Sequence, residues 1–428
     1  MTYDETLGYL YSQMPEYQRI GERAYKVGLD NSLALDRIFE HPHRQYKTIH
    51  VAGTNGKGST SHLLAAILQE AGYKTGLYTS PHLTDFRERI RVNGKMIDKQ
   101  FVVAFTEQYR EQFEPVMPSF FELTMEMAFL WFARQKVDIA VIEVGLGGRL
   151  DSTNIITPEL SIITNIGFDH MKFLGNTLPL IAAEKAGIIK PGVPVVIGEK
   201  GEPEVEKVFR EKARSVQAPI RFAEETISDL TAVQIGTGWL YRTREYPELK
   251  GELSGFAQQK NTRTVLTAVR LLQERGYAIP HEAVRTAFSN VVSLTGLRGR
   301  WQLLKAKPKI ICDIAHNAHG LRDVMEQLKS ESCTQLHLVF GMANDKDTES
   351  VFPLLPKEGR YYFTKASVER ALDEHLLQEQ AARHGLQGKT FSTVAAAIAA
   401  AMENADEADL IFIGGSSFVV ADALPLFI

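Results

Sequence analysis

The chain has 428 residues, of which 44% are hydrophobic and 23% charged, and its formal net charge is −4. This composition is ordinary for a globular protein of two or three domains, and the weak negative charge argues against a nucleic-acid partner. Two cysteines, Cys312 and Cys333, exclude a disulfide framework and a cysteine-based zinc site. The start resembles no signal peptide, and no apolar run approaches the roughly 20 residues that span a bilayer. We therefore expect a cytoplasmic protein without membrane contact.

The first 46 residues are predicted to form amphipathic helices, with apolar faces built from residues such as Leu10 and Leu35. Pro42 marks the end of this region. His41 and His43 flank the proline and would suit a metal site, but an exposed loop before the next strand is the preferred interpretation.

A glycine-rich loop lies between a predicted strand at 47–52 and a helix that begins near residue 57. The order of strand, glycine loop, lysine, hydroxyl and helix is typical of a phosphate-binding loop. Lys57 is placed to reach the outer phosphates, and Ser59 or Thr60 to hold Mg²⁺ or a phosphate oxygen. Because Gly58 separates Lys57 from Ser59, the pattern is not a standard Walker A, and a plain glycine turn remains the alternative.

Three further strands are predicted to bring polar side chains to the place where ligands bind. The strand at 74–79 is followed by Ser80, the strand at 138–145 contains Glu143, a candidate ligand for Mg²⁺, and the strand at 160–165 leads to His170. Parallel strands present their carboxyl ends at one edge of a sheet, where ligands bind in open α/β folds. The sequence thus predicts a hydroxyl, a carboxylate and an imidazole at that edge. A small hairpin at 88–94 and a strong helix at 120–133 complete this half.

The second half contains a long helix at 258–276 and a linker at 291–301, after which the β-α-β-α pattern restarts. Strands are predicted near 309–313, 335–341, 360–364 and 409–414. We therefore predict an α/β fold with a P-loop NTPase-like large domain at 1–295, whose sheet is mostly parallel, and a smaller Rossmann-like domain at 296–428.

Seven strings in order resemble the folylpolyglutamate synthase/dihydrofolate synthase branch of the Mur ligase superfamily. The strings are I-H-V-A-G-T-N-G-K-G-S at 49–59, Y-T-S-P-H-L at 78–83, F-E-L-T at 121–124, E-V-G-L-G-G-R-L-D-S-T-N at 143–154, N-I-G-F-D-H at 165–170, E-K-A-G-I-I-K at 184–190 and D-I-A-H-N at 313–317. The resemblance runs through nearly the whole chain. It implies an ATP-dependent amide ligase that joins L-glutamate to dihydropteroate or to the γ-carboxylate of a folate through an acyl phosphate.

The resemblance also implies roles for individual residues. Mg²⁺, as two ions, would be held by Ser80, Glu143 and His170, with a carbamylated lysine at Lys185. The catalytic group would contain Lys57, Lys185 and His316. The nucleotide would be bound by Gly53, Thr54, Asn55, Gly56, Lys57, Gly58, Ser59, Asn261, Arg300 and Asp313. The pterin would be bound by Ser119, Phe120, Phe121, Glu122, Leu150, Asp151 and Ser152.

Two departures and three alternatives accompany this reading. Ala257 stands where the family often has a histidine, and Arg298 precedes Gly299-Arg300 where the family has proline. A folylpolyglutamate synthase without the second activity, a different Mur-type ligase and a P-loop switch are the alternatives. A switch has no need of His170 and Lys185, and the residues before the loop are too few for the UDP-binding domain of cell-wall ligases. The expected partners are small molecules only, and the expected state is a monomer.

Overall fold

The computed structural model describes residues 1–14 and 28–427, and the chain divides into two units. The first unit comprises 1–82, 86–252 and 258–297, and the second comprises 83–85, 253–257 and 298–428. The main change from the first unit to the second falls at 297/298, and the domain bounds 1–295 and 296–428 stay a prediction. Two short segments within 1–295 belong to the second unit, which no sequence pattern indicated.

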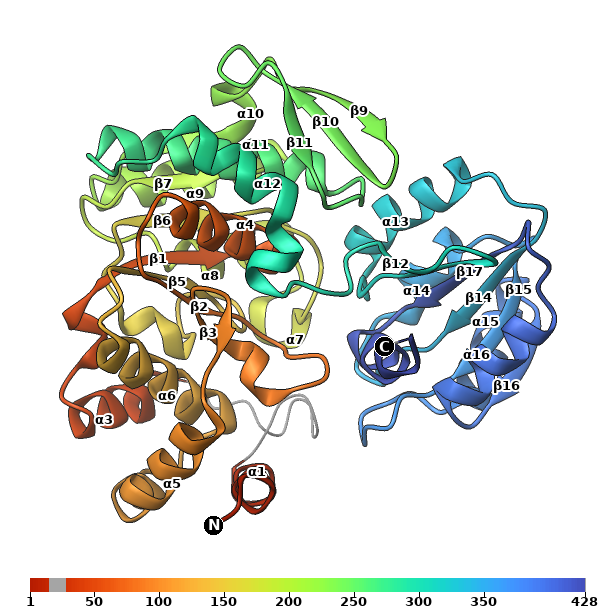
Figure 1. Ribbon diagram of the computed structural model, residues 1–428, viewed down its shortest axis with the longest axis horizontal. Helices are drawn as coiled ribbons and strands as arrows, with labels where there is room; N and C mark the ends of the chain where they lie inside the picture. The colour runs from red at the N-terminus through yellow and green to blue at the C-terminus, as the bar shows by residue number, and fades with distance from the viewer. Residues whose placement is uncertain (15–27, 428) are drawn as a thin grey trace. The chain divides into compact units, whose positions relative to one another are not determined.

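The first unit is built on an eight-stranded sheet with the order β4-β3-β2-β5-β1-β6-β7-β8 (Figure 1). The strands from β2 to β8 in this order are parallel, and the β3–β4 hairpin is antiparallel. The strands at 47–52, 74–79, 138–145 and 160–165 were predicted and are present. The eight strands have the following bounds: β1 Lys47–Ala52, β2 Thr75–Tyr78, β3 Ile90–Val92, β4 Lys95–Met96, β5 Ile139–Glu143, β6 Leu160–Ile163, β7 Val195–Ile197 and β8 Ile220–Phe222.

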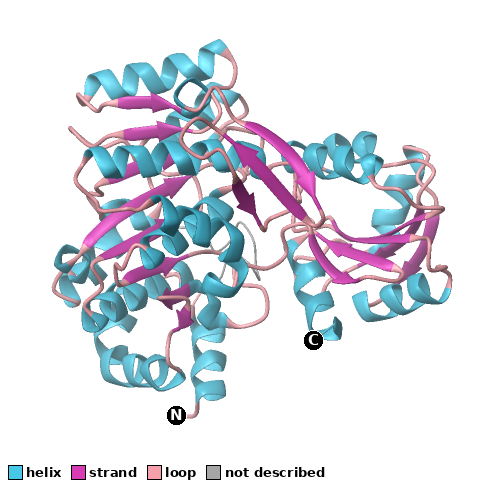
Figure 2. Ribbon diagram, turned by 45° about the horizontal axis from the view of Figure 1, so that its top comes forward, coloured by secondary structure: helices cyan, strands magenta, loops and turns pink. Residues whose placement is uncertain are grey.

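Helices cover both faces of this sheet (Figure 2). One face carries α4 (Lys57–Glu70), α11 (Gln258–Glu274) and α12 (His281–Thr295). The other face carries α6 (Phe120–Gln135), α8 (Leu178–Ala186) and α9 (Pro203–Ser215). The remaining helices are α1 Tyr3–Gln13, α3 Asp30–Ile38, the 3₁₀ turn η2 Pro42–Gln45, α5 Lys99–Phe113, α7 Met171–Leu174 and α10 Ala223–Thr226.

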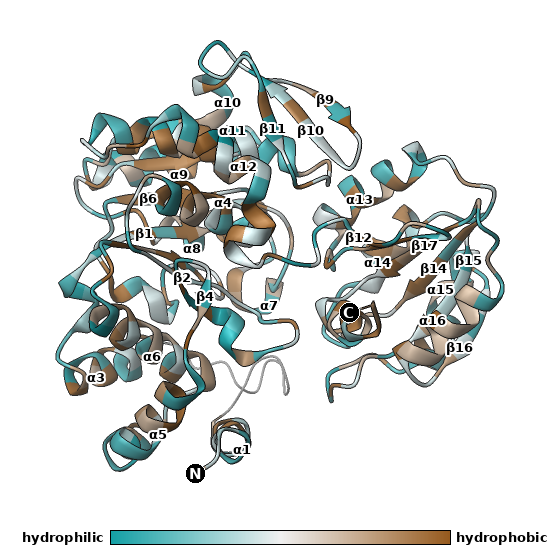
Figure 3. Cartoon of the chain, viewed as in Figure 1, coloured by the Kyte–Doolittle hydropathy of each residue, from teal (hydrophilic) through white to brown (hydrophobic). Residues whose placement is uncertain are grey.

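Burial explains why these segments adopt their structure. The central strands are mostly hydrophobic, whereas outer helices such as α5 have one hydrophilic and one hydrophobic face (Figure 3). Every residue of β5 is buried, as expected for a parallel strand with helices on both faces. The hairpin turn at Asn93-Gly94 has positive φ at both residues, as a tight two-residue turn requires. A separate antiparallel sheet of β9 (Thr231–Ile235), β10 (Gly238–Arg242) and β11 (Leu249–Gly251) follows β8.

The second unit has its own six-stranded sheet with the order β12-β13-β17-β14-β15-β16. The four predicted strands correspond to β13 (Lys309–Cys312), β14 (Leu336–Phe340), β15 (Arg360–Thr364) and β17 (Leu410–Gly414). The additional edge strands are β12 (Gln302–Lys305), which is antiparallel, and β16 (Gly388–Phe391). Its helices are α13 Ala318–Ser330, α14 Thr348–Val351, α15 Glu374–Arg383, α16 Val394–Glu403 and α17 Ser417–Ala423.

The prediction of an α/β fold with a large, mostly parallel sheet and a second α/β domain is confirmed. None of the helices in the described ranges 1–14 and 28–427 has the length and apolarity to cross a membrane.

Candidate functional site

The loop between β1 and α4 is a tight turn that only glycine permits at two positions. Gly53 and Gly56 have φ of 148° and 80°, which L side chains rarely adopt. A Cβ at Gly53 would collide with the hydroxyl of Thr164, and one at Gly56 would collide with the side-chain amide of Asn261. The loop backbone therefore comes close to its neighbours just before the N-terminus of α4, where N–H groups favour an anion.

The end of β6 holds this loop in place. Asn165 accepts hydrogen bonds from Thr54 N at its backbone oxygen (3.1 Å) and from Asn55 N at Oδ1 (2.9 Å). Thr164 Oγ1 donates to Asn55 O, and Gly167 N donates to Thr54 Oγ1. Thr164, Asn165 and Gly167 had no predicted role. Asn165 and Gly167 belong to the N-I-G-F-D-H string, from which only the histidine was assigned a role, and Thr164 directly precedes it.

Two lysines share one carbonyl oxygen beside the loop. Gly53 O accepts from Lys57 Nζ at 3.1 Å and from Lys185 Nζ at 2.9 Å. Lys185 lies on α8 and is 4% exposed, because Gly148 brings the loop after β5 directly against the backbone of Lys185. Burial, followed by the charge of Lys57, lowers the pKa of Lys185 to about 7. The side chain is therefore partly neutral near physiological pH.

The predicted metal ligands lie at the carboxyl ends of three strands of one sheet. Ser80 follows β2, Glu143 is the last residue of β5, and His170 follows β6 and precedes α7. Glu143 is 4% exposed and accepts a hydrogen bond from Ser80 N at 3.2 Å. The structure thus joins Ser80 and Glu143 directly. It places His170 beyond β6, with β1 between β5 and β6.

Residues of α11 complete the surroundings of the loop. Asn261 lies against Gly56, and its Nδ2 donates to Gln258 Oε1 at 3.0 Å. Gln258 Nε2 in turn donates to Ser59 Oγ at 3.4 Å. Asn261 therefore lies beside the phosphate loop, and its role in nucleotide binding stays a prediction. Gln258, which had no predicted role, orients both Asn261 and Ser59.

The three other residues predicted for the nucleotide and for catalysis lie in the second unit. Asp313 follows β13 and accepts hydrogen bonds from Trp301 N and Ala315 N, both at 2.8 Å. Burial raises the pKa of Asp313. Arg300 donates to the backbone of residues 298 and 299, and His316 Nδ1 lies 3.0 Å from Ile314 O. The described contacts of all three are local, and their roles stay predictions.

The first group of residues predicted for the pterin lies at the start of α6. Ser119 and Glu122 form a capping box, in which each side chain accepts from the backbone N–H of the other. Phe120 is 1% exposed and packs inside the core, which argues against contact with a substrate. Phe121 is half-buried, with its ring against Gly145, and is the member of this group that faces the glycine loop after β5.

The second group predicted for the pterin follows the same glycine loop. The Asp151 carboxylate accepts from Leu146 N at 2.8 Å and from Thr153 N at 3.0 Å, so it holds the loop together. Burial raises the pKa of Asp151. Leu150 and Ser152, on either side of it, are half-buried. Leu150 and Ser152 are accessible to a ligand, whereas the Asp151 carboxylate already accepts hydrogen bonds from the loop backbone.

Two family models match the chain, and together they cover much of both units. Residues 51–229 match the Mur ligase middle domain, and residues 299–417 match the Mur ligase, glutamate ligase domain.

Relatives and solved structures agree with these matches. The dihydrofolate synthase/folylpolyglutamate synthase of Bacillus subtilis is 36% identical, covering 77% of this chain and 79% of its own. The structure of E. coli FolC in complex with DHPP and ADP is 27% identical, covers 100% of this chain and 97% of its own, and has a TM-score of 0.84. A bifunctional synthase of Yersinia pestis complexed with AMPPNP and Mn ion is 28% identical, covers 100% and 98%, and has a TM-score of 0.82. The chain therefore belongs to the folylpolyglutamate synthase/dihydrofolate synthase family and is an ATP-dependent ligase built from Mur ligase domains.

Proposed function

We propose that the protein joins L-glutamate both to dihydropteroate and to the γ-carboxylate of tetrahydrofolates. In the first step the substrate carboxylate attacks the γ-phosphorus of ATP, which forms an acyl phosphate and releases ADP. In the second step the glutamate amine attacks the acyl carbon, an amide bond forms, and phosphate leaves while the amine loses its proton. The observation that supports this most is the pairing of Lys57 with buried Lys185 at Gly53 O, beside the sheet edge that presents Glu143.

The loop suits the polyphosphate of ATP. The absence of side chains at Gly53 and Gly56 lets the loop pack closely against Thr164 and Asn261. The N–H groups of such a glycine loop would be available to phosphate oxygens. Lys57 adds a positive charge at the N-terminus of α4. Both reaction steps bring anions together, and fixed positive groups in a site of low dielectric constant stabilise the charge that develops.

The donor atoms at the sheet edge suit a divalent cation. The Glu143 carboxylate and the Ser80 hydroxyl are hard oxygen donors, and His170 offers an imidazole nitrogen. Bound Mg²⁺ would neutralise phosphate oxygens of ATP. Nearly complete burial of the Glu143 carboxylate is otherwise unfavourable, so a cation held beside it would stabilise the charged form.

We infer that Lys185 is carbamylated in the active enzyme. Without carbamylation, protonated Lys57 and Lys185 would place two positive charges at one carbonyl oxygen. The repulsion between these charges contributes to the lowered pKa of Lys185. The neutral amine is the form that attacks CO₂, giving a carbamate and one released proton. The carbamate would convert the repulsion from Lys57 into attraction and would add a carboxylate for a second metal ion.

For the pterin we infer binding by the half-buried residues Phe121, Leu150 and Ser152. Ser119, Glu122 and Asp151 support them, since their described hydrogen bonds shape the start of α6 and the loop after β5. L-Glutamate, ATP and the pterin or folate would be the only partners, and action as a monomer in the cytoplasm stays a prediction.

The proposal is tested by giving the purified protein ATP, Mg²⁺ and L-glutamate with either dihydropteroate or tetrahydrofolate and measuring ADP release. We expect turnover with both substrates. Turnover with tetrahydrofolate alone would leave a folylpolyglutamate synthase without the dihydrofolate synthase activity. Turnover with neither would reject the proposal and favour a ligase that acts on a different acid.

A further inference from the structure

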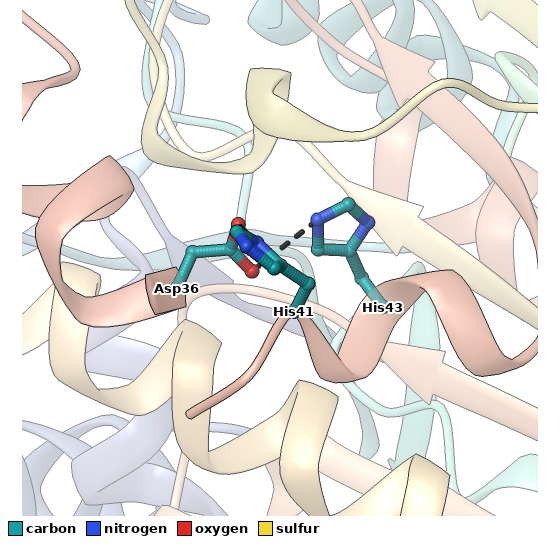
Figure 4. Close-up of side chains that lie close together, drawn as sticks. All are labelled: Asp36, His41 and His43. Carbon is teal, nitrogen blue, oxygen red and sulfur yellow. Dashed lines mark hydrogen bonds and ion pairs between the residues drawn. The ribbon is translucent and has the colours of Figure 1, made fainter. Parts of the chain in front are cut away.

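Asp36, His41 and His43 form a cluster outside the ligase site. Asp36 lies in the last turn of α3, His41 precedes η2, and His43 is inside η2 (Figure 4). His43 is 8% exposed, so the prediction of an exposed loop for this histidine was wrong. His43 is buried because η2 packs against α6, with the centre of the His43 ring 5.7 Å from the centre of the Phe129 ring.

The two imidazoles approach the carboxylate from different sides. His41 Nδ1 lies 2.5 Å from Asp36 Oδ2, and His43 Nε2 lies 3.3 Å from Asp36 Oδ1. One ligand atom from each of the three residues lies within 4.8 Å of the others, and no other group of three His, Cys, Asp or Glu within 1–14 and 28–427 does so. Two donor atoms of a tetrahedral ion with bonds of ~2.0 Å lie about 3.3 Å apart, so small side-chain shifts would bring the three donors around one ion.

The carboxylates here are incompletely satisfied within the described residues. Asp36 is 3% exposed, and its Oδ1 lies at ion-pair distance from His43 Nε2 without forming a hydrogen bond. Glu126 on α6 is completely buried, and neither of its oxygens has a hydrogen-bond partner. Glu126 lies three residues before Phe129, so both share the face of α6 that meets His43. Burial, together with the charge of Asp36, raises the pKa of Glu126 well above its usual range, which favours its neutral form. The Asp36 carboxylate is therefore the charge that a cation here would compensate.

The backbone conformation at Glu40 and His41 and the exposure of the His41 side chain also suit a metal site. Glu40 and His41 are consecutive non-glycine residues with φ of 59° and 56°, a conformation that costs free energy and persists only where its surroundings compensate. The His41 side chain is 35% exposed, which gives an ion and water a route to the cluster. Two imidazoles and a carboxylate favour Zn²⁺ or a related first-row ion over Mg²⁺, which prefers oxygen donors.

We propose that Asp36, His41 and His43 bind one Zn²⁺ ion, which ties the end of α3 to the segment that leads into β1. Binding displaces the proton shared by His41 Nδ1 and Asp36 Oδ2 and leaves a fourth position for water. Nothing in the ligase reaction requires this ion, so its role is to stabilise the first unit.

The test uses the untagged full-length protein, stripped of metal and titrated with ZnCl₂ while excess Mg²⁺ is present to compete at the sheet edge. We expect one equivalent of Zn²⁺ to bind and the melting temperature to rise. Co²⁺ in place of Zn²⁺ should produce the intense visible absorption of a four-coordinate site. His41→Asn, in which asparagine tolerates positive φ, should weaken Zn²⁺ binding at least about tenfold and abolish the cobalt band.

His281→Asn is the matched control, because His281 is an exposed histidine of the first unit whose imidazole lies near Glu245. His170→Asn separates this site from the ligase site. Both variants should retain the tight equivalent of Zn²⁺ and the cobalt band. Absence of binding to the wild-type protein, or unchanged binding by His41→Asn, would overturn the proposal and leave an ion-pair cluster that closes α3. Loss of the band in His170→Asn would place the ion at the ligase site and also overturn it.

Discussion

Replacing Lys185 by alanine is expected to lower the rate of glutamate-dependent ADP release on the order of 10²- to 10³-fold, the range found when one preorganised electrostatic group is lost. Lys185 is buried beside the phosphate loop and contacts Gly53 O at 2.9 Å. Without its nitrogen no carbamate can form. High bicarbonate should therefore not restore the activity of the variant.

Lys190→Ala is the matched control for this prediction. Lys190 belongs to the same string, is half-buried, and donates to Asn154 O at 2.8 Å. The control should keep most of its activity. With ¹³CO₂, the wild-type protein should show a carbamate carbon signal that weakens as the pH falls below about 7, because protonation of Lys185 removes the reactive amine. The variant Lys185→Ala should lack this signal, and full activity in that variant would reject the role of the carbamate.

Glu143→Gln is expected to cause the second large loss, also on the order of 10²- to 10³-fold in turnover. The amide oxygen of glutamine still accepts the hydrogen bond from Ser80 N, which Glu143 Oε2 accepts at 3.2 Å, so the fold should persist. The negative charge is lost, however, and hard cations bind neutral oxygens less well than carboxylates. The measurement is ADP release as a function of Mg²⁺ concentration, and the half-saturating concentration should rise.

Glu159→Gln provides the comparison at the other end of the same sheet. Glu159 immediately precedes β6 and pairs with Lys47 and Arg275. This substitution should leave the dependence on Mg²⁺ unchanged. If Glu143→Gln had the same Mg²⁺ dependence as the wild-type protein, the metal would have to be held by other residues.

Much of the fold could be predicted because local patterns decide it. The buried strands β1, β5 and β6 are mostly apolar runs bounded by glycine or polar residues. The parallel pairing of β2 with β5 brings Ser80 and Glu143 to one edge. The phosphate loop was also predictable, since its glycines allow the positive φ angles that this turn requires. Neither inference needs knowledge of distant contacts.

The remaining features depend on contacts between segments far apart in the chain. Taken by itself Lys185 reads as a surface lysine, and its burial results from the packing of Gly148 against its backbone. His43 packs against Phe129 of α6, which lies more than 80 residues later in the chain. The segments 83–85 and 253–257 belong to the second unit. This assignment could not be predicted from the sequence, because each segment is too short to have a periodic pattern. Strand β12 contains exposed residues because it lies at a sheet edge, which hides it from a search for buried strands.

Activation of the substrate carboxylate as an acyl phosphate would transfer one carboxylate oxygen to phosphate. The decisive experiment is to incubate tetrahydrofolate labelled with ¹⁸O in its γ-carboxylate with the enzyme, ATP, Mg²⁺ and L-glutamate. We expect one ¹⁸O atom in each inorganic phosphate released, with ADP and amide product formed in equal amounts. Unlabelled phosphate, or formation of AMP and pyrophosphate, would contradict activation as an acyl phosphate.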